Sequence, residues 1–134
     1  MPRMSAIAPY FLVADVVRAA ENYRNKLGFS IRGYFFEDPP VFGMVGRDGL
    51  TIMLSRVDAS RGGSNRGHKN VGIDAYLWID GADALFEEFR QAGANLMGSP
   101  VVRTYGMKEF EVRDLDGYVL CFGQDVPATK TTPT

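Results

Sequence analysis

The sequence has few of the residues that build disulfides and catalytic metal centres. Its 134 residues include one cysteine, Cys121, and one histidine, His68. A single cysteine cannot form an internal disulfide, and a single histidine cannot supply the imidazole cluster that many catalytic metals need. With one residue of each type, the chain cannot form a disulfide-stapled fold, and a histidine-rich metal enzyme is disfavoured.

The sequence also has no large excess of positive or negative charge and no long apolar run. The formal net charge is −1, so no basic field draws the molecule to nucleic acid or to an anionic membrane. No run approaches the ~20 apolar residues of a membrane span. The opening stretch MPRMSAIAPY has no apolar signal segment. We therefore expect a cytoplasmic protein whose partner is a small molecule or another protein, without nucleic-acid or membrane partners.

What the sequence does contain is a degenerate repeat. Each copy has a strand, an aspartate, a helix-period segment and a glycine: Tyr10–Val13, Asp15 and Gly28 in the first, and Tyr76–Ile79, Asp80 and Gly93 in the second. The aspartate can cap the first helical turn and the glycine can end the helix in a left-handed conformation. The aromatic residues at helical spacing, Tyr23, Phe86 and Phe89, indicate a core-facing stripe.

A second pair of similar segments closes each copy. Residues 48–55 match residues 116–123 in polarity, and both predict a turn followed by an alternating strand. Two further strands precede each closing strand, at 29–36 and 41–47 and at 95–104 and 106–113. Each half therefore has the order βαβββ, which predicts an α+β fold.

These patterns also predict the domain organisation. A single domain over 1–124 would contain module 1 at about 5–58, a linker at 59–70 and module 2 at about 71–124. The linker is polar and glycine-rich, although it could instead be a mobile flap. Residues 125–134 have little to bury and are predicted to be a disordered tail.

Alternation along the repeated strands separates two faces. One set is apolar and predicts a core beneath the helices: Ile7, Phe11, Val13, Leu50, Ile52, Leu54, Ala75, Leu77, Ile79, Leu120 and Phe122. The other set is chemically mixed: Ala8, Tyr10, Leu12, Thr51, Met53, Ser55, Asp74, Tyr76, Trp78, Val119, Cys121 and Gly123. A face that is neither charged nor uniformly apolar is typical of a ligand cleft. A dimer interface or a second buried layer is the alternative.

Two βαβββ units with these turns resemble the vicinal oxygen chelate superfamily, which includes glyoxalase I, extradiol dioxygenases and bleomycin-resistance proteins. The resemblance covers about residues 5–124. Its most specific part is Tyr105-Gly-Met-Lys-Glu-Phe-Glu-Val-Arg-Asp-Leu-Asp-Gly117, which is similar to a run in the metal-free bleomycin-resistance branch. The resemblance implies two modules related by a pseudo-twofold, forming a curved mixed sheet with the helices on its convex side.

The resemblance also bears on metal binding. The superfamily's enzymes take four metal ligands from positions that here hold Ala8, Met53, Asp74 and Cys121. Alanine has no donor atom, and a methionine thioether is a poor ligand for hard divalent ions. The prediction is that the protein has no metal, no other cofactor and no catalytic residues, although enzymatic activity stays open.

By this resemblance the protein is a small-molecule binding or sequestering protein, with a role in antibiotic resistance. A homodimer would hold an aromatic ligand that can also be cationic. The predicted ligand-binding residues are Tyr10, Met53, Asp74, Tyr76, Trp78, Tyr105, Glu109 and Cys121. Glu109 could instead form a salt bridge with Arg103 or Arg113, and Cys121 is better explained as a buried thiol than as a nucleophile.

Two other functions remain open. A divergent metal-dependent lyase, isomerase or dioxygenase of the same superfamily would need Asp74, Glu109 and water to hold an ion. A non-catalytic interaction module would fill the mixed face with a partner chain.

Overall fold

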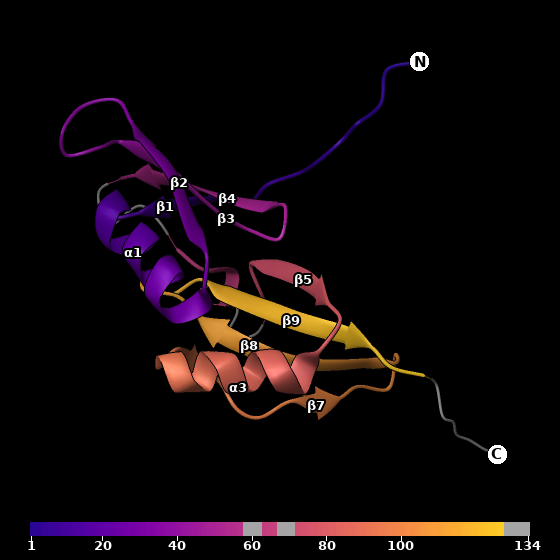
Figure 1. Ribbon diagram of the computed structural model, residues 1–134. Coiled ribbons are helices and arrows are strands. Elements are labelled where there is room, and N and C mark those ends of the chain that lie inside the picture. The colour runs from indigo at the N-terminus through magenta and orange to yellow at the C-terminus, as the bar shows by residue number, and fades with distance from the viewer. Residues whose placement is uncertain (58–62, 67–71, 128–134) are drawn as a thin grey trace. The chain divides into compact units, whose positions relative to one another are not determined.

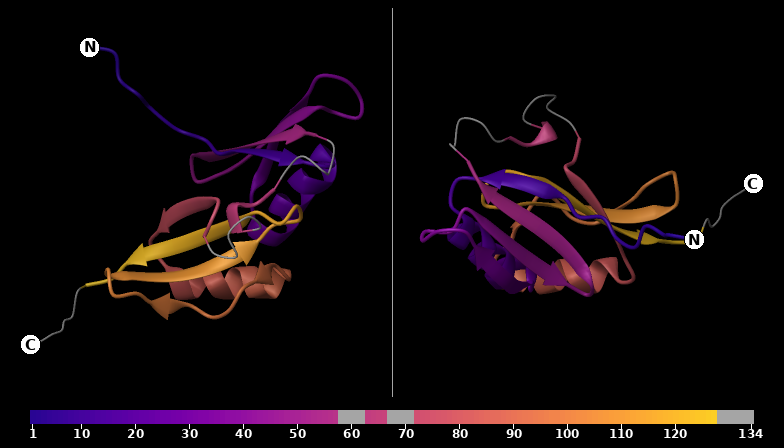
Figure 2. Two further views of the ribbon diagram at one scale, coloured as in Figure 1. Left: turned by 180° about the vertical axis from the view of Figure 1, so that it is seen from behind. Right: turned by 90° about the horizontal axis from the view of Figure 1, so that it is seen from above.

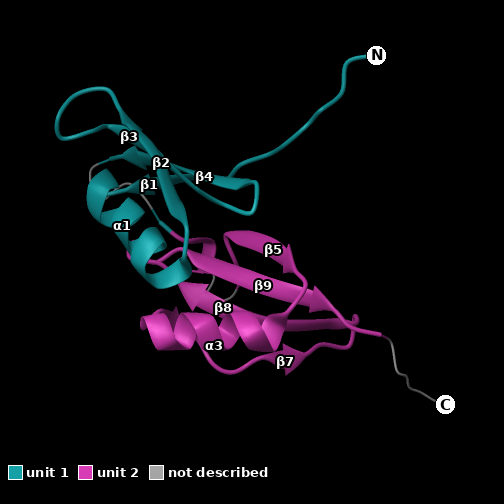
Figure 3. Cartoon of the chain, viewed as in Figure 1, with its two compact units in different colours: residues 1–63 teal, residues 64–134 magenta. Residues whose placement is uncertain are grey.

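The computed structural model describes residues 1–57, 63–66 and 72–127. These divide into two units, unit 1 over residues 1–63 and unit 2 over residues 64–134 (Figure 3). Of the predicted linker at 59–70, only residues 63–66 are described, and 128–134 of the predicted tail also lie outside the described residues. The predicted module boundaries stay predictions, and each unit is treated separately below.

The described residues of unit 1 form one helix and four strands. They are β1 (Tyr10–Val13), α1 (Val16–Leu27), β2 (Ser30–Phe35), β3 (Phe42–Arg47) and β4 (Leu50–Arg56). The strand order is β1-β4-β3-β2, with β1 parallel to β4 and the other pairs antiparallel. In Figure 1, α1 lies along one side of this sheet, and residues 1–57 place no helix on its other side.

The boundaries of α1 follow from its sequence. The Asp15 side chain accepts a hydrogen bond from the Arg18 amide at 3.0 Å, and Gly28 follows the helix in a left-handed conformation with φ 72°. Tyr23 and Leu27 are among the residues that the helix buries against the sheet. The predicted cap, stop and core stripe of this helix are confirmed.

Unit 2 repeats the arrangement with one added strand. Its elements are β5 (Ala75–Ile79), α3 (Ala82–Ala92), β6 (Asn95–Leu96), β7 (Val101–Val102), β8 (Met107–Arg113) and β9 (Val119–Asp125). The sheet order is β5-β9-β8-β6, and β7 also pairs with β8. Figure 2 shows α3 running along one side of β8 and β9. Both units are thus βαβββ-like modules with mixed sheets, as the sequence predicts.

Two details of unit 2 differ from the prediction. The expected strand at 95–104 is divided into β6 and β7, because Gly98 adopts φ 108° and Pro100 has no amide to donate to a ladder. The predicted cap by Asp80 is wrong: Gly81 is the N-cap residue, and the Gln124 side chain accepts a hydrogen bond from the Ala82 amide at 2.9 Å.

Each unit has its own apolar core between helix and sheet. Phe11, Val13, Val45 and Leu54 join the α1 stripe in unit 1, and Phe89, Phe110, Val112, Leu120 and Phe122 form the core of unit 2. Two predicted core residues are exposed, Ile7 at 95% and Leu50 at 47%. Ile7 precedes the start of β1 at Tyr10, and Leu50 directly follows the turn at Asp48 and Gly49.

Candidate functional site

The candidate site lies on the face of the unit 2 sheet that points away from α3. Phe110 and Phe122 pack on Phe89 of α3, so their sequence neighbours Glu109 and Cys121 face the other way. The strand register pairs Tyr76 of β5 with Cys121 of β9. Three adjacent strands therefore contribute side chains to one surface.

Glu109 is at the centre of this surface and is 6% exposed. The Tyr76 hydroxyl donates to Glu109 Oε2 at 2.7 Å, and Arg103 Nε donates to Oε1 at 3.4 Å. The Tyr105 hydroxyl and the Cys121 thiol lie close enough to this carboxylate for its charge to raise the pKa of both groups. Two hydrogen bonds, from Tyr76 and Arg103, thus hold the Glu109 carboxylate within the sheet surface.

The network determines which of these groups are charged. Burial acts to raise the pKa of Glu109, but hydrogen bonds from Tyr76, Tyr105 and Arg103 outweigh burial and lower it. Burial, with the hydrogen bond to Glu109, raises the pKa of Tyr76. Burial and the charge of Glu109 raise the pKa of Cys121 to about 12. At neutral pH the carboxylate is ionised while the phenol and the thiol stay protonated, so Cys121 is not an activated nucleophile.

Two aromatic rings beside this network are open to solvent. Trp78 is 72% exposed, and its ring centroid lies 4.7 Å from that of Tyr76. Tyr105 is 65% exposed. Gly123 makes room for the arrangement, because a Cβ at this position would collide with the Tyr76 hydroxyl. The polar network thus holds Tyr76 in place, and Tyr76 supports Trp78.

Asp74 lies apart from this group. Its Oδ2 accepts from Ser64 Oγ at 2.6 Å and from the Val119 amide at 2.8 Å, and its Oδ1 accepts from the Asn65 amide at 2.6 Å. The backbone amide of Asp74 pairs with Val119, whereas Glu109 is opposite Gly123, four residues further along β9 and roughly 13 Å away. The structure does not bring the two acids together.

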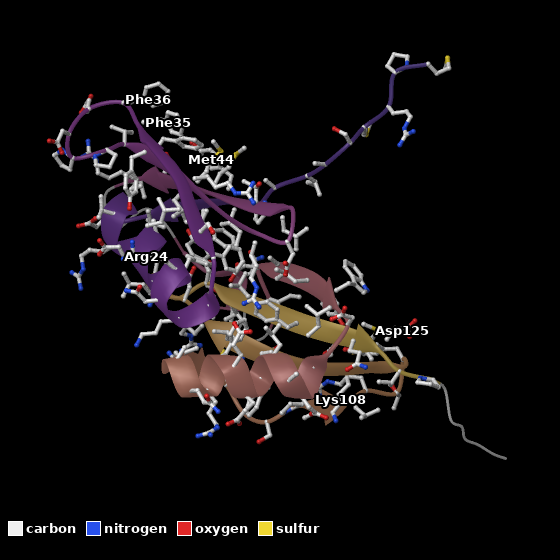
Figure 4. All side chains as sticks on the ribbon, in the orientation of Figure 1. Arg24, Phe35, Phe36, Met44, Lys108 and Asp125 are labelled. Carbon is white, nitrogen blue, oxygen red and sulfur yellow. The ribbon has the colours of Figure 1, made fainter. Side chains whose placement is uncertain are left out.

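The corresponding face of unit 1 is aromatic and apolar. The Tyr10 and Phe42 rings stack with their centroids 6.1 Å apart, and Phe35 and Phe36 lie 5.9 and 6.5 Å from Phe42. Figure 4 shows Phe35, Phe36 and Met44 on the side of the strands away from α1. Phe35 and Met44 are not among the predicted site residues, although the alternation of side chains along β2 and β3 places both on this face.

Met53 belongs to the same face. It lies opposite Tyr10 on one side and Met44 on the other. Of the predicted site residues, Tyr10 and Met53 therefore share a surface in unit 1, and Tyr76, Trp78, Tyr105, Glu109 and Cys121 share one in unit 2. Their role in binding a ligand stays a prediction.

The superfamily's metal-ligand positions do not fit a divalent ion in this chain. In unit 1, Ala8 offers no donor and Met53 offers only a thioether. In unit 2, both Asp74 oxygens accept other hydrogen bonds, and the raised pKa of Cys121 keeps its thiol protonated at neutral pH. Across the described ranges, no group of three or more His, Cys, Asp or Glu side chains could hold a metal ion. No helix in that part of the chain is long and apolar enough to span a membrane.

Known proteins with this fold include both enzymes and drug-binding proteins. A glyoxalase-related enzyme from Clostridium phytofermentans has a TM-score of 0.76 and 16% identity, covering 93% of this chain and 98% of its own. TioX from Micromonospora sp. ML1 has a TM-score of 0.71 and 19% identity, covering 92% and 100%. The bleomycin-binding protein of Streptomyces verticillus, complexed with copper(II)-bleomycin, has a TM-score of 0.66 and 22% identity, covering 94% and 98%.

At these identities the solved structures show a shared fold. None of the curated proteins matches the sequence. The model of one protein family, however, matches residues 6–122, which is most of the chain. The protein therefore belongs to the glyoxalase/bleomycin resistance protein/dioxygenase superfamily.

Proposed function

We propose that this protein binds and sequesters an aromatic small molecule without using a metal ion, in the manner of a bleomycin-resistance protein. The observation that carries the proposal is the surface formed by Tyr76, Trp78 and Tyr105 around the buried Glu109. Sequestration of a toxic compound by such a surface would protect the cell that makes the protein.

The geometry of the rings supports binding of a flat ligand. Trp78 and Tyr105 expose most of their surface, while Tyr76 is fixed by its 2.7 Å hydrogen bond to Glu109. An offset-stacked or edge-on aromatic contact contributes about 1 kcal/mol beyond the area that it buries. A ligand that meets two or three rings already held in place does not pay the full entropy of ordering them.

The titratable groups on this surface support binding more than catalysis. Glu109 is ionised, buried and already accepts from Tyr76 and Arg103, and the Tyr76 hydroxyl and the Cys121 thiol keep their protons at neutral pH. A general base needs a lone pair within reach of the substrate, and a nucleophile needs to lose its proton. The fold's capacity for drug binding is illustrated by the Streptomyces verticillus protein complexed with copper(II)-bleomycin.

The homodimer is the second part of this proposal. The aromatic cluster of unit 1 leaves Tyr10 57%, Phe35 39% and Phe36 71% exposed. Clustered apolar exposure of this kind marks an interaction surface more often than free surface. Light scattering during gel filtration should give twice the mass of the 14.8 kDa chain. A mass of one chain at micromolar concentration would contradict this part alone.

Trp78 provides a direct test of ligand binding because it is the only tryptophan. Titration with planar aromatic compounds, copper-free bleomycin among them, should shift the single indole N–H signal in a ¹⁵N correlation spectrum and saturate. Calorimetry with the best compound should then show about tenfold weaker binding for Trp78→Leu, in line with the loss of one stacking contact and its buried area.

Leu115→Ala is the matched control. Leu115 is 48% exposed in the turn between β8 and β9, at the opposite end of these strands from Trp78. This variant should bind as the wild type does. Absence of any saturable shift across the compounds would refute the proposed function.

A further inference from the structure

Three acids near the candidate site already pair with groups of the protein itself. Glu109 accepts from Tyr76 and Arg103, and the carboxylate of Asp74 accepts from three donors. Glu111, which is opposite Cys121 on β8, forms an ion pair with Arg66 at 2.7 Å. A cationic ligand that paired with one of these three acids would have to break its arrangement, leaving a buried or half-buried donor without its partner.

An exposed positive charge lies beside the rings, at Arg103, and Asp125 at the end of β9 is an exposed negative charge on the same face of the sheet. The Arg103 side chain is 48% exposed, whereas that of its partner Glu109 is 7% exposed. Within residues 1–57, 63–66 and 72–127, the Arg103 side chain bonds only to Glu109, through Nε. The two terminal amino groups of its guanidinium therefore have donors available for a ligand.

Arg103 is also held in position by its backbone. Its amide donates to the Met107 carbonyl at 2.7 Å, and its carbonyl accepts from the Gly106 amide at 3.1 Å. Gly106 has φ 85°, which favours glycine at this turn, and its carbonyl accepts from the Val126 amide at 2.9 Å. The turn that carries Arg103 and Tyr105 is thus tied to both adjoining strands, which favours a preorganised contact.

We infer that the ligand of this surface is a planar aromatic compound bearing an acidic oxygen, with its ring on Trp78 and Tyr105 and its anionic group on Arg103. This inference rests on the proposed function and narrows the ligand class, replacing the cationic ligand that the family resemblance suggests. A guanidinium pairs with a carboxylate through two parallel N–H donors, and it can donate a charge-assisted hydrogen bond to a single phenolate oxygen. Glu109 then serves to orient Arg103 and Tyr76 and does not contact the ligand.

Three probes with one ring system test the inference: 2-naphthoate, 2-naphthylmethanol and 2-naphthylmethylammonium, which are anionic, neutral and cationic. Each is titrated into ¹⁵N-labelled full-length protein while the Trp78 indole signal is followed. The expected order of affinity is naphthoate, then the alcohol, then the ammonium compound. Because Arg103 is half-exposed, the first step should be about fivefold, as for a partly solvated ion pair.

Arg103→Gln should lower the affinity for naphthoate to that for the alcohol and leave the alcohol unchanged. Arg113→Gln is the control, because it removes the same charge from an exposed position at the other end of β8. A preference for the ammonium compound, or equal binding of all three, overturns the inference while leaving the proposed function intact. Binding of none of the three at millimolar concentration counts against the proposed function, and the inference is lost with it.

Discussion

The two units pair their strands in the same way, but equivalent positions carry aromatic and apolar side chains in unit 1 and a hydrogen-bonded polar network in unit 2. Tyr10 lies opposite Met53 in unit 1, as Tyr76 lies opposite Cys121 in unit 2. Phe42 in unit 1 and Glu109 in unit 2 are also equivalent. Phe42 lies two residues before Met44, the β3 residue opposite Met53, and Glu109 lies two residues before Glu111, the β8 residue opposite Cys121. Tyr10 stacks on Phe42, whereas Tyr76 donates a hydrogen bond to Glu109.

The helix side of each sheet differs as well. Gly43 follows Phe42 in β3, and a Cβ there would meet Val16 of α1 at 2.7 Å. The matching residue of unit 2 is Phe110, whose ring lies 5.4 Å from Phe86 and 5.9 Å from Phe89 of α3. One repeat thus uses a glycine to let its helix approach closely, and the other fills the gap with an aromatic ring. The repeat conserves strand pairing and leaves the contents of both faces free to change.

The largest expected effect is loss of the ring that fills unit 2. Phe110 is 3% exposed and contacts three aromatic rings, so Phe110→Ala should cost about 3–5 kcal/mol of unfolding free energy. Urea denaturation followed by circular dichroism measures it. Phe36→Ala removes a ring that is 71% exposed in unit 1 and should change the stability by less than about 0.5 kcal/mol. Equal losses in the two variants would show that the described core of unit 2 is wrong.

Glu109→Gln tests the polar half of the comparison and should cost about 2 kcal/mol at pH 7. The glutamine amide has the same shape as the carboxylate but no charge, so the hydrogen bond from Arg103 becomes weaker. Its NH2 group also replaces one acceptor oxygen with two N–H donors, which face the Tyr76 hydroxyl or the Arg103 guanidinium without an acceptor. Glu87→Gln is the control, since it removes an exposed carboxylate paired with Arg90 on α3 and should have a smaller effect. A neutral result for Glu109→Gln would mean that the network contributes nothing to folding.

The same variant should alter the dependence of stability on pH. The pKa of Glu109 is lowered in the folded protein from an ordinary value of 4.5. Its ionised form therefore stabilises the fold fully above pH ~4.5, and this contribution is lost as the pH falls through the folded-state value. The difference in stability between wild type and Glu109→Gln should shrink on acidification below pH ~4.5. A difference that grows on acidification would contradict the lowered pKa.

Gly123→Ala tests whether the tyrosine of unit 2 depends on the absence of a side chain on the neighbouring strand. The added Cβ would displace the Tyr76 hydroxyl from its place over β9 and break its bond to Glu109. We expect a loss of about 1–2 kcal/mol and a shifted Trp78 indole signal. The register places Ser55 at the equivalent position of unit 1, opposite Phe42, and Ser55→Ala should be within about 0.5 kcal/mol of wild type. An unchanged indole signal in Gly123→Ala would show that Tyr76 does not support Trp78.

The helices and strands were predictable because burial of one face places apolar residues at a regular spacing along the sequence. The alternation of residues 75–79 and 119–123 identified the face that carries Tyr76 and Cys121, and the register confirms it. The bond between Tyr76 and Glu109 was not predictable, since it joins residues 33 positions apart and depends on pairing across three strands. The same limit applies to Asp74, whose partners Ser64 and Asn65 come from the predicted linker.

The two helix starts make the smallest and most specific comparison. Both helices follow a strand and an aspartate, but Asp15 caps α1 while α3 has no side-chain cap at Gly81 and receives Gln124 from β9 instead. Asp15→Ala should cost about 1 kcal/mol, the usual value of a lost N-cap, and Asp80→Ala should cost almost nothing. Gln124→Ala, by contrast, should destabilise unit 2, because the Ala82 amide then loses its acceptor. If Asp80→Ala lowered the free energy of unfolding as much as Asp15→Ala does, both helices would be capped by the aspartate of the sequence repeat. The contact from Gln124 on β9 would then not be what stabilises the start of α3.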